Sequence, residues 1–571
     1  MKKFLLLMAV SALFAQNIDS KPVTVEQAMA IARQTTATHS LRGANASLKL
    51  DYVAQGLKGT NDYYVFNREG GNGFVIVAGD DVSTPILGYS DKGSFNINEA
   101  PEPLKYLLDA YQHDLEWMRQ NLDGAAPVTP SFNLQPYGVL PICGDVHWHQ
   151  FPPYNNNCPA SPHALTSNGR CYAGCAPVAF ATIMKGLKYP RTGFGENTYS
   201  FMLDGREVTV SANFANRIYK YSDMKNGYGE NAYNAQAVSE LMFDVGIAFN
   251  TKFSGESSDA LLRNIFRGMI AYFDYNANIQ YVQKSNYQYN LQGWYDMMYN
   301  EIDNGRPVYY FGYRTIDNSG NKCHIGHAFV LDGYDKDGKV HVNWGFQPEE
   351  YNAYFDFTLL SPRSDYDYDP YDSGFNADQA AIIGICPDTT DLGGLVVKNV
   401  NLVADTMPAN DIRASIDVQS LSGKWNGTLR YGIVSKTSDS YSTMYTFTTN
   451  VDIESNGIAN IDLSGAYPYL REGQTYYIVV WTPYFANSYD WNWFLDEPVA
   501  FTVGDWVTPP DPTVVQGDVN GDSIVDIDDV TTLVDNLMAG VEYNEAADMD
   551  ENGVVDIDDL TILIDKLVAG E

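Results

Sequence analysis

The sequence predicts an α+β protein made of several units. With 571 residues, the chain is too long for one hydrophobic core, and about three or four domains are expected. Helical spacing of apolar residues alternates with short aromatic and β-branched runs over residues 16–390, whereas residues 391–505 read almost wholly as strands. Residues 517–571 contain an internal repeat.

The composition excludes some classes of protein. Hydrophobic residues make up 45% of the chain, so it should fold rather than remain disordered. The net charge is −35, from 36 basic and 71 acidic residues, which argues against a nucleic-acid partner. Six cysteines are few for a disulfide scaffold of this length, and if one stays a free thiol for chemistry the rest cannot all pair. They are Cys143, Cys158, Cys171, Cys175, Cys323 and Cys386.

Residues 1–15 have the features of a secretory signal. Lys2 and Lys3 give a basic start, residues 4–14 form a short apolar run, and small residues near Ala15 allow cleavage. The run is well short of the ~20 residues that a membrane span needs. We therefore expect a secreted chain, extracellular or attached to the cell surface, without a membrane span.

Residues 16–135 are expected to form a first unit of mixed α and β structure. The run TVEQAMAIAR predicts a helix with Thr24 as its N-cap and Gln27 completing a capping box. The runs YYVFN and GFVIVAGDD predict strands, and residues 103–122 return to helical spacing. The loose stretch 123–136 is typical of a linker and of a proteolysis site.

The segment GRCYAGCAPVAFATIMKGLKYP carries the candidate nucleophile. From Ala176 onward its apolar residues follow helical spacing, so Cys175 is expected at the N-terminus of a buried helix. Free N–H groups and the helix dipole favour an anion there, and the thiolate is the reactive form of cysteine. A core residue or half-cystine at Cys175 is the structural alternative, and Cys171 is the rival nucleophile. The apolar face consists of Phe180, Ile183, Met184 and Leu187.

A nucleophilic cysteine needs a base that is close in space. The segment GHAFVLDGYDKDGKVHVNWG predicts a β-hairpin with strands at residues 328–331 and 340–344. With a turn centred near residue 335 or 336, His327 at the start of the first strand lies nearly opposite Asn343. Asn343 could then hold the imidazole by a hydrogen bond, and Trp344 could shield that bond from water.

Two further histidines are alternatives to His327, and one glutamine is a candidate for stabilising the oxyanion. His324 and His341 compete with His327 for the role of base. The reaction also needs donors for an oxyanion, and Gln150, in the segment VHWHQFPPYNNNCP, could donate its side-chain N–H together with the backbone N–H of Cys175. An ordinary surface glutamine is the alternative.

Several separate motifs resemble those of streptopain-like cysteine peptidases, a branch of the papain clan. WHQFPPYNNNCP, GCAPVAFATIMKGLKYP, GHAFVLDGY, HVNWG and FNADQAAIIGICP occur in the family's order. The resemblance implies a papain-like peptidase core over residues 136–390, with Cys175 as nucleophile, His327 as base and Gln150 as oxyanion donor. It also implies an endopeptidase that uses no metal in catalysis and prefers an apolar residue two positions before the cleaved bond.

The resemblance extends upstream and has one departure. YYVFNREGGNGFVIVAGDDVSTPILGYS is similar to the family's inhibitory propeptide, so residues 16–135 are expected to keep a precursor inactive. Either Asn343 or Trp344 is expected to support the histidine. Family members commonly continue as NWGWGG beside the cleft, whereas Trp344 is followed here by Gly345, Phe346, Gln347 and Pro348. The lost glycines affect the expected shape of the non-primed substrate pocket and not the catalytic pair.

Downstream of the peptidase unit the sequence carries no catalytic constellation. Regularly spaced strand patterns over residues 391–505 predict a β-sandwich with a structural or substrate-docking role, and residues 506–516 form a Pro-rich linker. The alternative to a peptidase is a catalytically inactive adhesin that binds protein through this sandwich. The intact trio Cys175, His327 and Gln150 argues against that alternative.

The repeat in residues 517–571 predicts two calcium sites. DVNGDSIVDIDD recurs 30 residues later as DMDENGVVDIDD, with oxygen ligands at the spacing of an EF-hand-like loop, and a helical stretch follows each loop. Paired loops ending in Asp resemble a type I dockerin, which implies structural Ca²⁺ and a cohesin-like protein partner. A solvated acidic tail is the alternative. The candidate ligands are Asp518, Asn520, Asp522, Asp526 and Asp529, then Asp548, Asp550, Asn552, Asp556 and Asp559.

Overall fold

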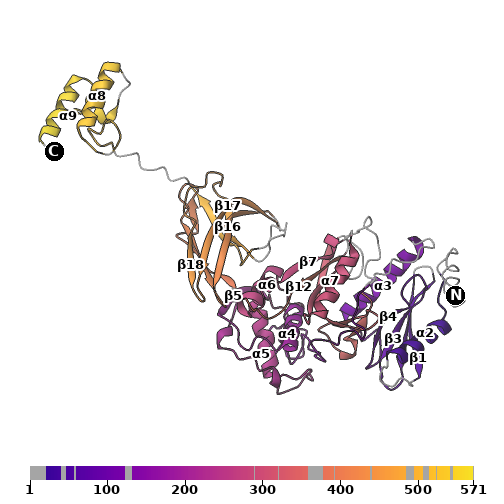
Figure 1. Ribbon diagram of the computed structural model, residues 1–571. Coiled ribbons are helices and arrows are strands. Elements are labelled where there is room, and N and C mark those ends of the chain that lie inside the picture. The colour runs from indigo at the N-terminus through magenta and orange to yellow at the C-terminus, as the bar shows by residue number, and fades with distance from the viewer. Residues whose placement is uncertain are drawn as a thin grey trace, which may run out of the picture. The chain divides into compact units, whose positions relative to one another are not determined.

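The computed structural model describes most of the chain (Figure 1). The predicted signal, most of the predicted cleavage stretch and most of the predicted linker lie outside the described residues. Two compact units are present, one containing the residues up to 401 with 414–463 and 476–500, the other 402–413, 464–475 and 501–571. The described residues are 21–39, 47–56, 59–121, 132–287, 290–318, 321–357, 377–390, 393–437, 440–483, 494–505, 514–522, 524–540 and 544–569.

A ten-stranded antiparallel sheet is the main feature of the first unit. Strand β4 of the N-terminal segment pairs with β11, with Gly88 opposite Phe355 and Tyr89 opposite Tyr354, so the predicted first unit and the catalytic unit share one sheet. The strands in spatial order are β1 (Leu48–Gln55), β2 (Asn61–Arg68), β3 (Phe74–Ala78), β4 (Ile86–Ser90), β11 (Ala353–Phe355), β10 (Val340–Asn343), β9 (Asn321–Tyr334), β8 (Val308–Asn318), β12 (Ala377–Ile383) and β7 (Gln280–Gln283).

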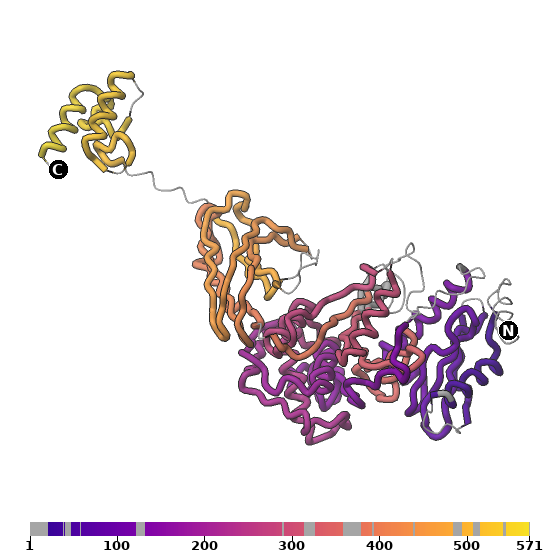
Figure 2. Tube along the Cα trace, in the orientation of Figure 1, coloured from indigo at the N-terminus to yellow at the C-terminus, as the bar shows by residue number. Residues whose placement is uncertain are grey.

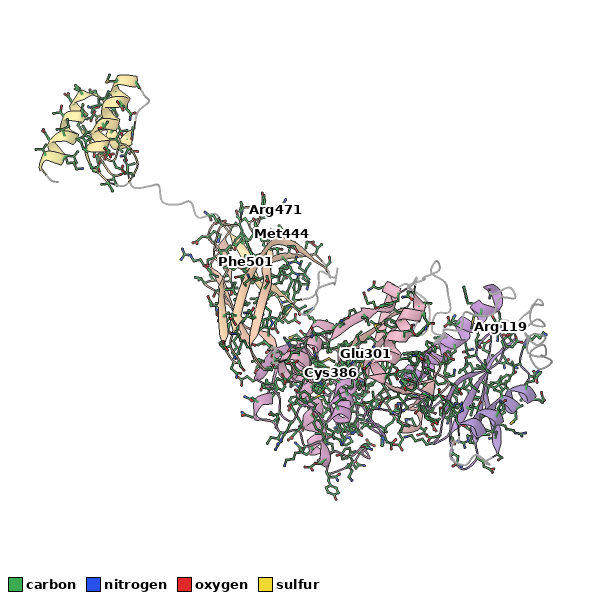
Figure 3. All side chains as sticks on the ribbon, viewed as in Figure 1. Arg119, Glu301, Cys386, Met444, Arg471 and Phe501 are labelled. Carbon is green, nitrogen blue, oxygen red and sulfur yellow. The ribbon has the colours of Figure 1, made fainter. Side chains whose placement is uncertain are left out.

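Two helices of the N-terminal segment pack against β1–β4. Helix α2 (Val25–Thr38) begins with the predicted capping box of Thr24 and Gln27. Helix α3 (Glu102–Asn121) carries Arg119, which forms ion pairs with Asp62 and Asp80 and is labelled in Figure 3.

The hydrophobic core under α3 continues into the catalytic unit. It joins residues of α3 and β2–β4 to residues of β8–β11 and of helix α7 (Leu291–Asp303). The buried hydroxyl of Tyr111 donates to the carbonyls of Leu87 and Asp356, at 3.1 and 2.7 Å. The N-terminal segment is therefore packed as part of the catalytic unit's own core.

A second core surrounds helix α4 (Cys175–Leu187). The predicted apolar face is confirmed, because Phe180, Ile183 and Met184 are buried and Leu187 packs against them. The other elements of this part are the hairpin β5 (Glu196–Leu203) and β6 (Arg206–Asn213), helices α5 (Gln236–Ala248) and α6 (Leu262–Arg267), and the short helices η1 (Phe214–Asn216), η2 (Tyr221–Asp223), η3 (Gly268–Tyr272), η4 (Lys284–Tyr287) and η5 (Glu349–Tyr351).

The segment after residue 390 is composed of strands where the sequence predicts them. In the first unit β15 pairs with β18, and β16 pairs with both β17 and β19. In the second unit β14 runs parallel to β20. Their bounds are β13 (Leu395–Leu402), β14 (Thr406–Pro408), β15 (Ala414–Ser420), β16 (Trp425–Thr437), β17 (Ser440–Ile453), β18 (Ile458–Asp462), β19 (Thr475–Trp481) and β20 (Val499–Gly504).

The repeat folds as two loop–helix segments, shown in yellow in Figure 2. Helices α8 (Ile527–Ala539) and α9 (Ile557–Ala569) pack through Leu533 and Leu563, which are fully buried, and a short helix η6 (Glu545–Ala547) lies between them in sequence. Among the described helices, none is long and apolar enough to cross a membrane.

His39, at the end of α2, ties the N-terminal segment to the turn between β9 and β10. Its Nε2 lies 3.1 Å from Oδ2 of Asp335 and 3.0 Å from Oδ2 of Asp337, and its ring packs on Tyr89. Tyr89 in turn donates to Asp335. The hydrogen bond with Asp335 raises the pKa of His39 against the opposing effect of burial, so the structure favours the imidazolium.

This contact predicts a pH-dependent contribution to stability. Because the pKa of His39 is raised in the folded chain, the stabilisation is fully present below the ordinary value of about 6.5 and is lost as pH rises through the folded pKa. We expect His39→Gln to lower the free energy of unfolding by about 1–2 kcal/mol at pH 6 and by much less at pH 9. Thermal unfolding of both proteins across this range checks the prediction, and a difference that is the same at every pH would contradict it.

Candidate active site

Cys175 is the first residue of α4, as the sequence predicts. Gly174 precedes it with φ 95°, a conformation that favours glycine and lets the chain turn sharply into the helix. The backbone N–H groups of Cys175 and Ala176 point at the sulfur, which favours the thiolate. Burial outweighs these groups and raises the pKa of Cys175 above its ordinary value, so the resting side chain is a protonated thiol.

The backbone N–H of Ala328 on β9 also acts on the Cys175 sulfur and lowers the pKa of the thiol. Ala328 directly follows His327, so the two candidate catalytic residues lie on adjoining elements although 152 positions separate them in sequence. A hydrogen bond from the hydroxyl of Tyr309 to the carbonyl of Ala176 ties the first turn of α4 to β8. Helix α4 packs against β9, so Cys175 and His327 lie on contacting elements, and their roles as nucleophile and base stay a prediction.

His327 is buried and neutral. Its Nε2 lies 2.7 Å from the carbonyl oxygen of Trp344, which can only accept, so Nε2 carries the proton. Burial lowers the pKa of His327 to about 4, with the Trp344 bond acting in the opposite direction. The neutral ring therefore holds its lone pair on Nδ1, which is the form that a general base requires.

The predicted pairing of Asn343 with His327 is wrong. Strand β9 starts at Asn321, so His327 lies in mid-strand opposite Gly312, and Asn343 lies opposite Val330. A register shift between His341 and Val342 and the length of the turn change the alignment. The side chain of Asn343 instead donates to the Val146 carbonyl at 2.6 Å and accepts from the N–H of Gly345.

Trp344 supports the histidine through its backbone carbonyl. Its indole ring is 1% exposed and packs on Phe329 and Phe355, with ring centroids 4.9 and 5.7 Å away. Phe329 stacks on His327 at 6.0 Å, so these rings exclude water from one side of the imidazole. The carbonyl is fixed because the Trp344 N–H donates to the side chain of Asn352.

Gln150 lies next to the segment that leads into the nucleophile. Its carbonyl accepts from the N–H of Ala173, at 3.1 Å and two residues before Cys175. The adjacent His149 is buried, and Phe151 packs edge-to-face against Tyr172 and Phe346. This position beside the Cys175 segment is compatible with an oxyanion donor.

The rival residues occupy different surroundings. The Nδ1 of His341 lies 2.6 Å from Asp332, which also accepts from the N–H of Cys143, so this histidine belongs to a buried structural pair. The side chain of His324 lies outside the described residues. Cys171 is fully buried in the loop before α4, and burial raises its pKa to about 11.

Free thiols are found at five of the six cysteines. Cys158 and Cys171 are both free and buried. Cys386 lies near Glu301, and both are labelled in Figure 3. The side chain of Cys323 lies outside the described residues.

The two repeat loops have matching hydrogen-bond geometry. The buried Asp529 accepts from the N–H groups of Asn520 and Asp526, as Asp559 does from Asp550 and Asp556. In the second loop, ligand oxygens of three aspartates lie within 4.8 Å of one another, which fits a hard cation such as Ca²⁺. These three aspartates are Asp548, Asp550 and Asp559.

A thiol at a helix N-terminus beside a buried neutral histidine is the site of a cysteine peptidase. Residues 148–355 match the model of the peptidase C10 family, and residues 20–115 match that of the Spi protease inhibitor. The chain is 30% identical to the thiol protease/hemagglutinin PrtT of Porphyromonas gingivalis over 416 residues, 69% of this chain and 45% of that protein. It is 32% identical to streptopain of Streptococcus pyogenes over 355 residues, 60% of this chain and 85% of streptopain.

The chain belongs to the peptidase C10 family and is a cysteine peptidase with a propeptide-type inhibitor segment. Among solved structures it is similar to prointerpain A of Prevotella intermedia, with 27% identity and a TM-score of 0.48 over 60% of this chain and 99% of that one. The chain spans less than half the length of PrtT and most of the length of streptopain.

The sequence predicts a hydrogen bond between Asn343 and His327, whereas the structure predicts that the two residues affect stability and activity differently. Asn343→Ala removes the bond to Val146 but leaves the Trp344 carbonyl on His327, so we expect a loss of about 1–2 kcal/mol in stability and an unchanged pH–activity profile. His327→Ala is the matched control and should abolish peptide cleavage. Thermal unfolding measures the loss of stability, and initial rates measure the activity. A shifted pH–activity profile in Asn343→Ala would show that Asn343 does orient His327.

Proposed function

We propose that Cys175, His327 and Gln150 hydrolyse peptide bonds in protein substrates. The observation that carries this assignment is the Cys175 sulfur, which lies among N–H groups at the start of α4 and directly beside the residue that follows His327. The neutral imidazole can accept the thiol proton over the whole range above about pH 4.

The reaction follows from these positions. As the sulfur attacks the substrate carbonyl carbon, His327 takes the thiol proton, and the oxyanion accepts hydrogen bonds from the Cys175 N–H and the Gln150 side chain. His327 then returns the proton to the leaving amine, the C–N bond breaks, and a thioester forms on Cys175. Water, deprotonated by His327, hydrolyses the thioester and frees the thiol.

The N-terminal segment, residues 16–135 in the sequence, acts as the inhibitor of a precursor. After β4 it contacts the loop that follows Trp344: the N–H of Asn96 donates to the hydroxyl of Tyr351, which donates back to the Asn96 carbonyl, both at 3.0 Å. Tyr351 is 1% exposed and packs on Phe95. The N-terminal segment therefore contacts the loop directly after Trp344, the residue whose carbonyl orients His327, and its removal frees that loop from these contacts.

The remaining units serve export and attachment. Residues 1–15 direct secretion, and residues 391–505 form a sandwich with a structural or docking role. Residues 517–571 bind two Ca²⁺ ions and present a dockerin-like surface to a cohesin-like protein. Matching loop geometry and a shared buried helix core support the calcium assignment, and the metal has no part in catalysis.

Autocatalytic removal of the propeptide predicts a defined phenotype for the nucleophile variant. Cys175→Ala should accumulate as the precursor after loss of the signal, because it lacks the nucleophile that would cut between residues 123 and 136. Cys171→Ala is the matched control and should mature like the wild type, since the Cys171 side chain is fully buried in the loop before α4. Intact-mass analysis of purified protein distinguishes the forms, and normal maturation of Cys175→Ala would show that another protease makes the cut.

The same two variants separate a peptidase from an inactive adhesin. An epoxysuccinate inhibitor should alkylate the mature wild type and Cys171→Ala, and should leave Cys175→Ala unlabelled. Absence of labelling at Cys175 in active preparations would remove the basis of the proposed mechanism.

Calcium binding should be coupled to the folding of residues 517–571 and not to that of the peptidase unit. Without a cation the clustered carboxylates repel one another, and with Ca²⁺ they are neutralised so that α8 and α9 pack. We expect Asp529→Ala and Asp559→Ala in the full chain each to remove one of two sites in calorimetric titration. Peptide cleavage should be unaffected by a calcium chelator, and abolished cleavage would contradict the separation of the two functions.

A further inference from the structure

Gln347 links two parts of the active site that are far apart in the sequence. Its side-chain amide lies 2.6 Å from Nε2 of His149, the residue directly before Gln150. Gln347 directly follows Phe346, whose ring is 5.1 Å from the ring of His327 and 5.8 Å from that of Phe151. The contact thus joins the loop beside the catalytic base to the segment that carries the oxyanion donor.

The chemistry of His149 fixes the direction of this bond. Its Nδ1 accepts the backbone N–H of Phe151 at 3.2 Å, so Nδ1 is unprotonated. Burial lowers the pKa of His149 to about 3, so the ring is neutral, and the bond accepted at Nδ1 leaves its one proton on Nε2. His149 therefore donates. The atom of Gln347 placed against it is the amide nitrogen, which cannot accept, so the amide is turned over and its oxygen takes this position, as the hydrogen-bond network requires. Position 347 requires a hydrogen-bond acceptor.

The surroundings of His149 leave little freedom to the imidazole. The side chain is 1% exposed and packs edge-to-face on Tyr154, with ring centroids 4.4 Å apart. A buried N–H without an acceptor is costly, so loss of the Gln347 oxygen would favour movement of His149 and of the residue attached to it. Because the carbonyl of Gln150 bonds to Ala173, that movement would reach the oxyanion site.

We propose that Gln347 is a positioning residue, which holds the Gln150 segment in place through His149 while it fixes Phe346 beside His327. The glycine that the family commonly has at this position could not make the bond. The proposal rests on the proposed function, in which Gln150 stabilises the oxyanion. Both partners lie in the peptidase segment, so the contact remains after the propeptide is removed.

Substitutions that differ in acceptor chemistry test the proposal. Gln347→Met has a similar length and no oxygen, and we expect kcat to fall about tenfold with KM unchanged, because the oxyanion exists only in the transition state. Gln347→Glu presents only acceptors and should restore kcat to near the wild-type value. Gln236→Met, on the exposed start of α5, is the matched control and should behave as the wild type.

Rates would be measured on mature enzyme with a fluorogenic peptide, and each preparation would be normalised by titration of its reactive thiol with an epoxysuccinate. Nitrogen-15 NMR of the histidines should show His149 protonated on Nε2 in the wild type. Wild-type kcat in Gln347→Met, or a loss in Gln347→Glu equal to that in Gln347→Met, would overturn the proposal. If the wild type itself showed no thiol-dependent cleavage, the proposed function would fail instead, so the two failures are distinguishable.

Discussion

The N-terminus of α4 meets strand β9 at the sulfur of Cys175, and the catalytic unit is organised around that contact. The backbone N–H of Ala328 acts on the sulfur and lowers the pKa of Cys175, and Ala328 is the neighbour of His327 on the strand that packs against α4. The bond from His327 to the Trp344 carbonyl then fixes the tautomer of the base. Each of these interactions uses the backbone, so the geometry depends on how helix and sheet pack more than on any one polar side chain.

The N-terminal inhibitor segment belongs to the same sheet as His327. Because β4 pairs with β11 and α3 shares its core with β8–β10, the N-terminal segment is held by burial as well as by polar contacts. Without this segment β11 would be an edge strand and the apolar side chains that it covers would be exposed. The ion pair between His39 and Asp335 adds to this attachment, and it weakens as pH rises and His39 loses its proton.

Local patterns in the sequence predicted local structure well. The capping box at Thr24, the apolar face of α4 behind Cys175 and the repeated loop–helix segments are each written in a few adjacent residues. The error at Asn343 arose because strand register depends on a bulge and on turn length, and because its partner Val146 is 197 positions away. The β4–β11 pairing and the His149–Gln347 bond are likewise non-local, so no pattern of neighbouring residues could reveal them.

The pH dependence of Cys175 alkylation by iodoacetamide tests the central claim most directly. In mature wild-type enzyme His327 assists deprotonation of the thiol, so the rate at Cys175 should begin to rise at a lower pH than in His327→Ala. Peptide mapping should place the label on Cys175 and not on the buried Cys171. Identical profiles in the two proteins, or a label found mainly at Cys171, would contradict the assignment of Cys175 and His327 as the catalytic pair.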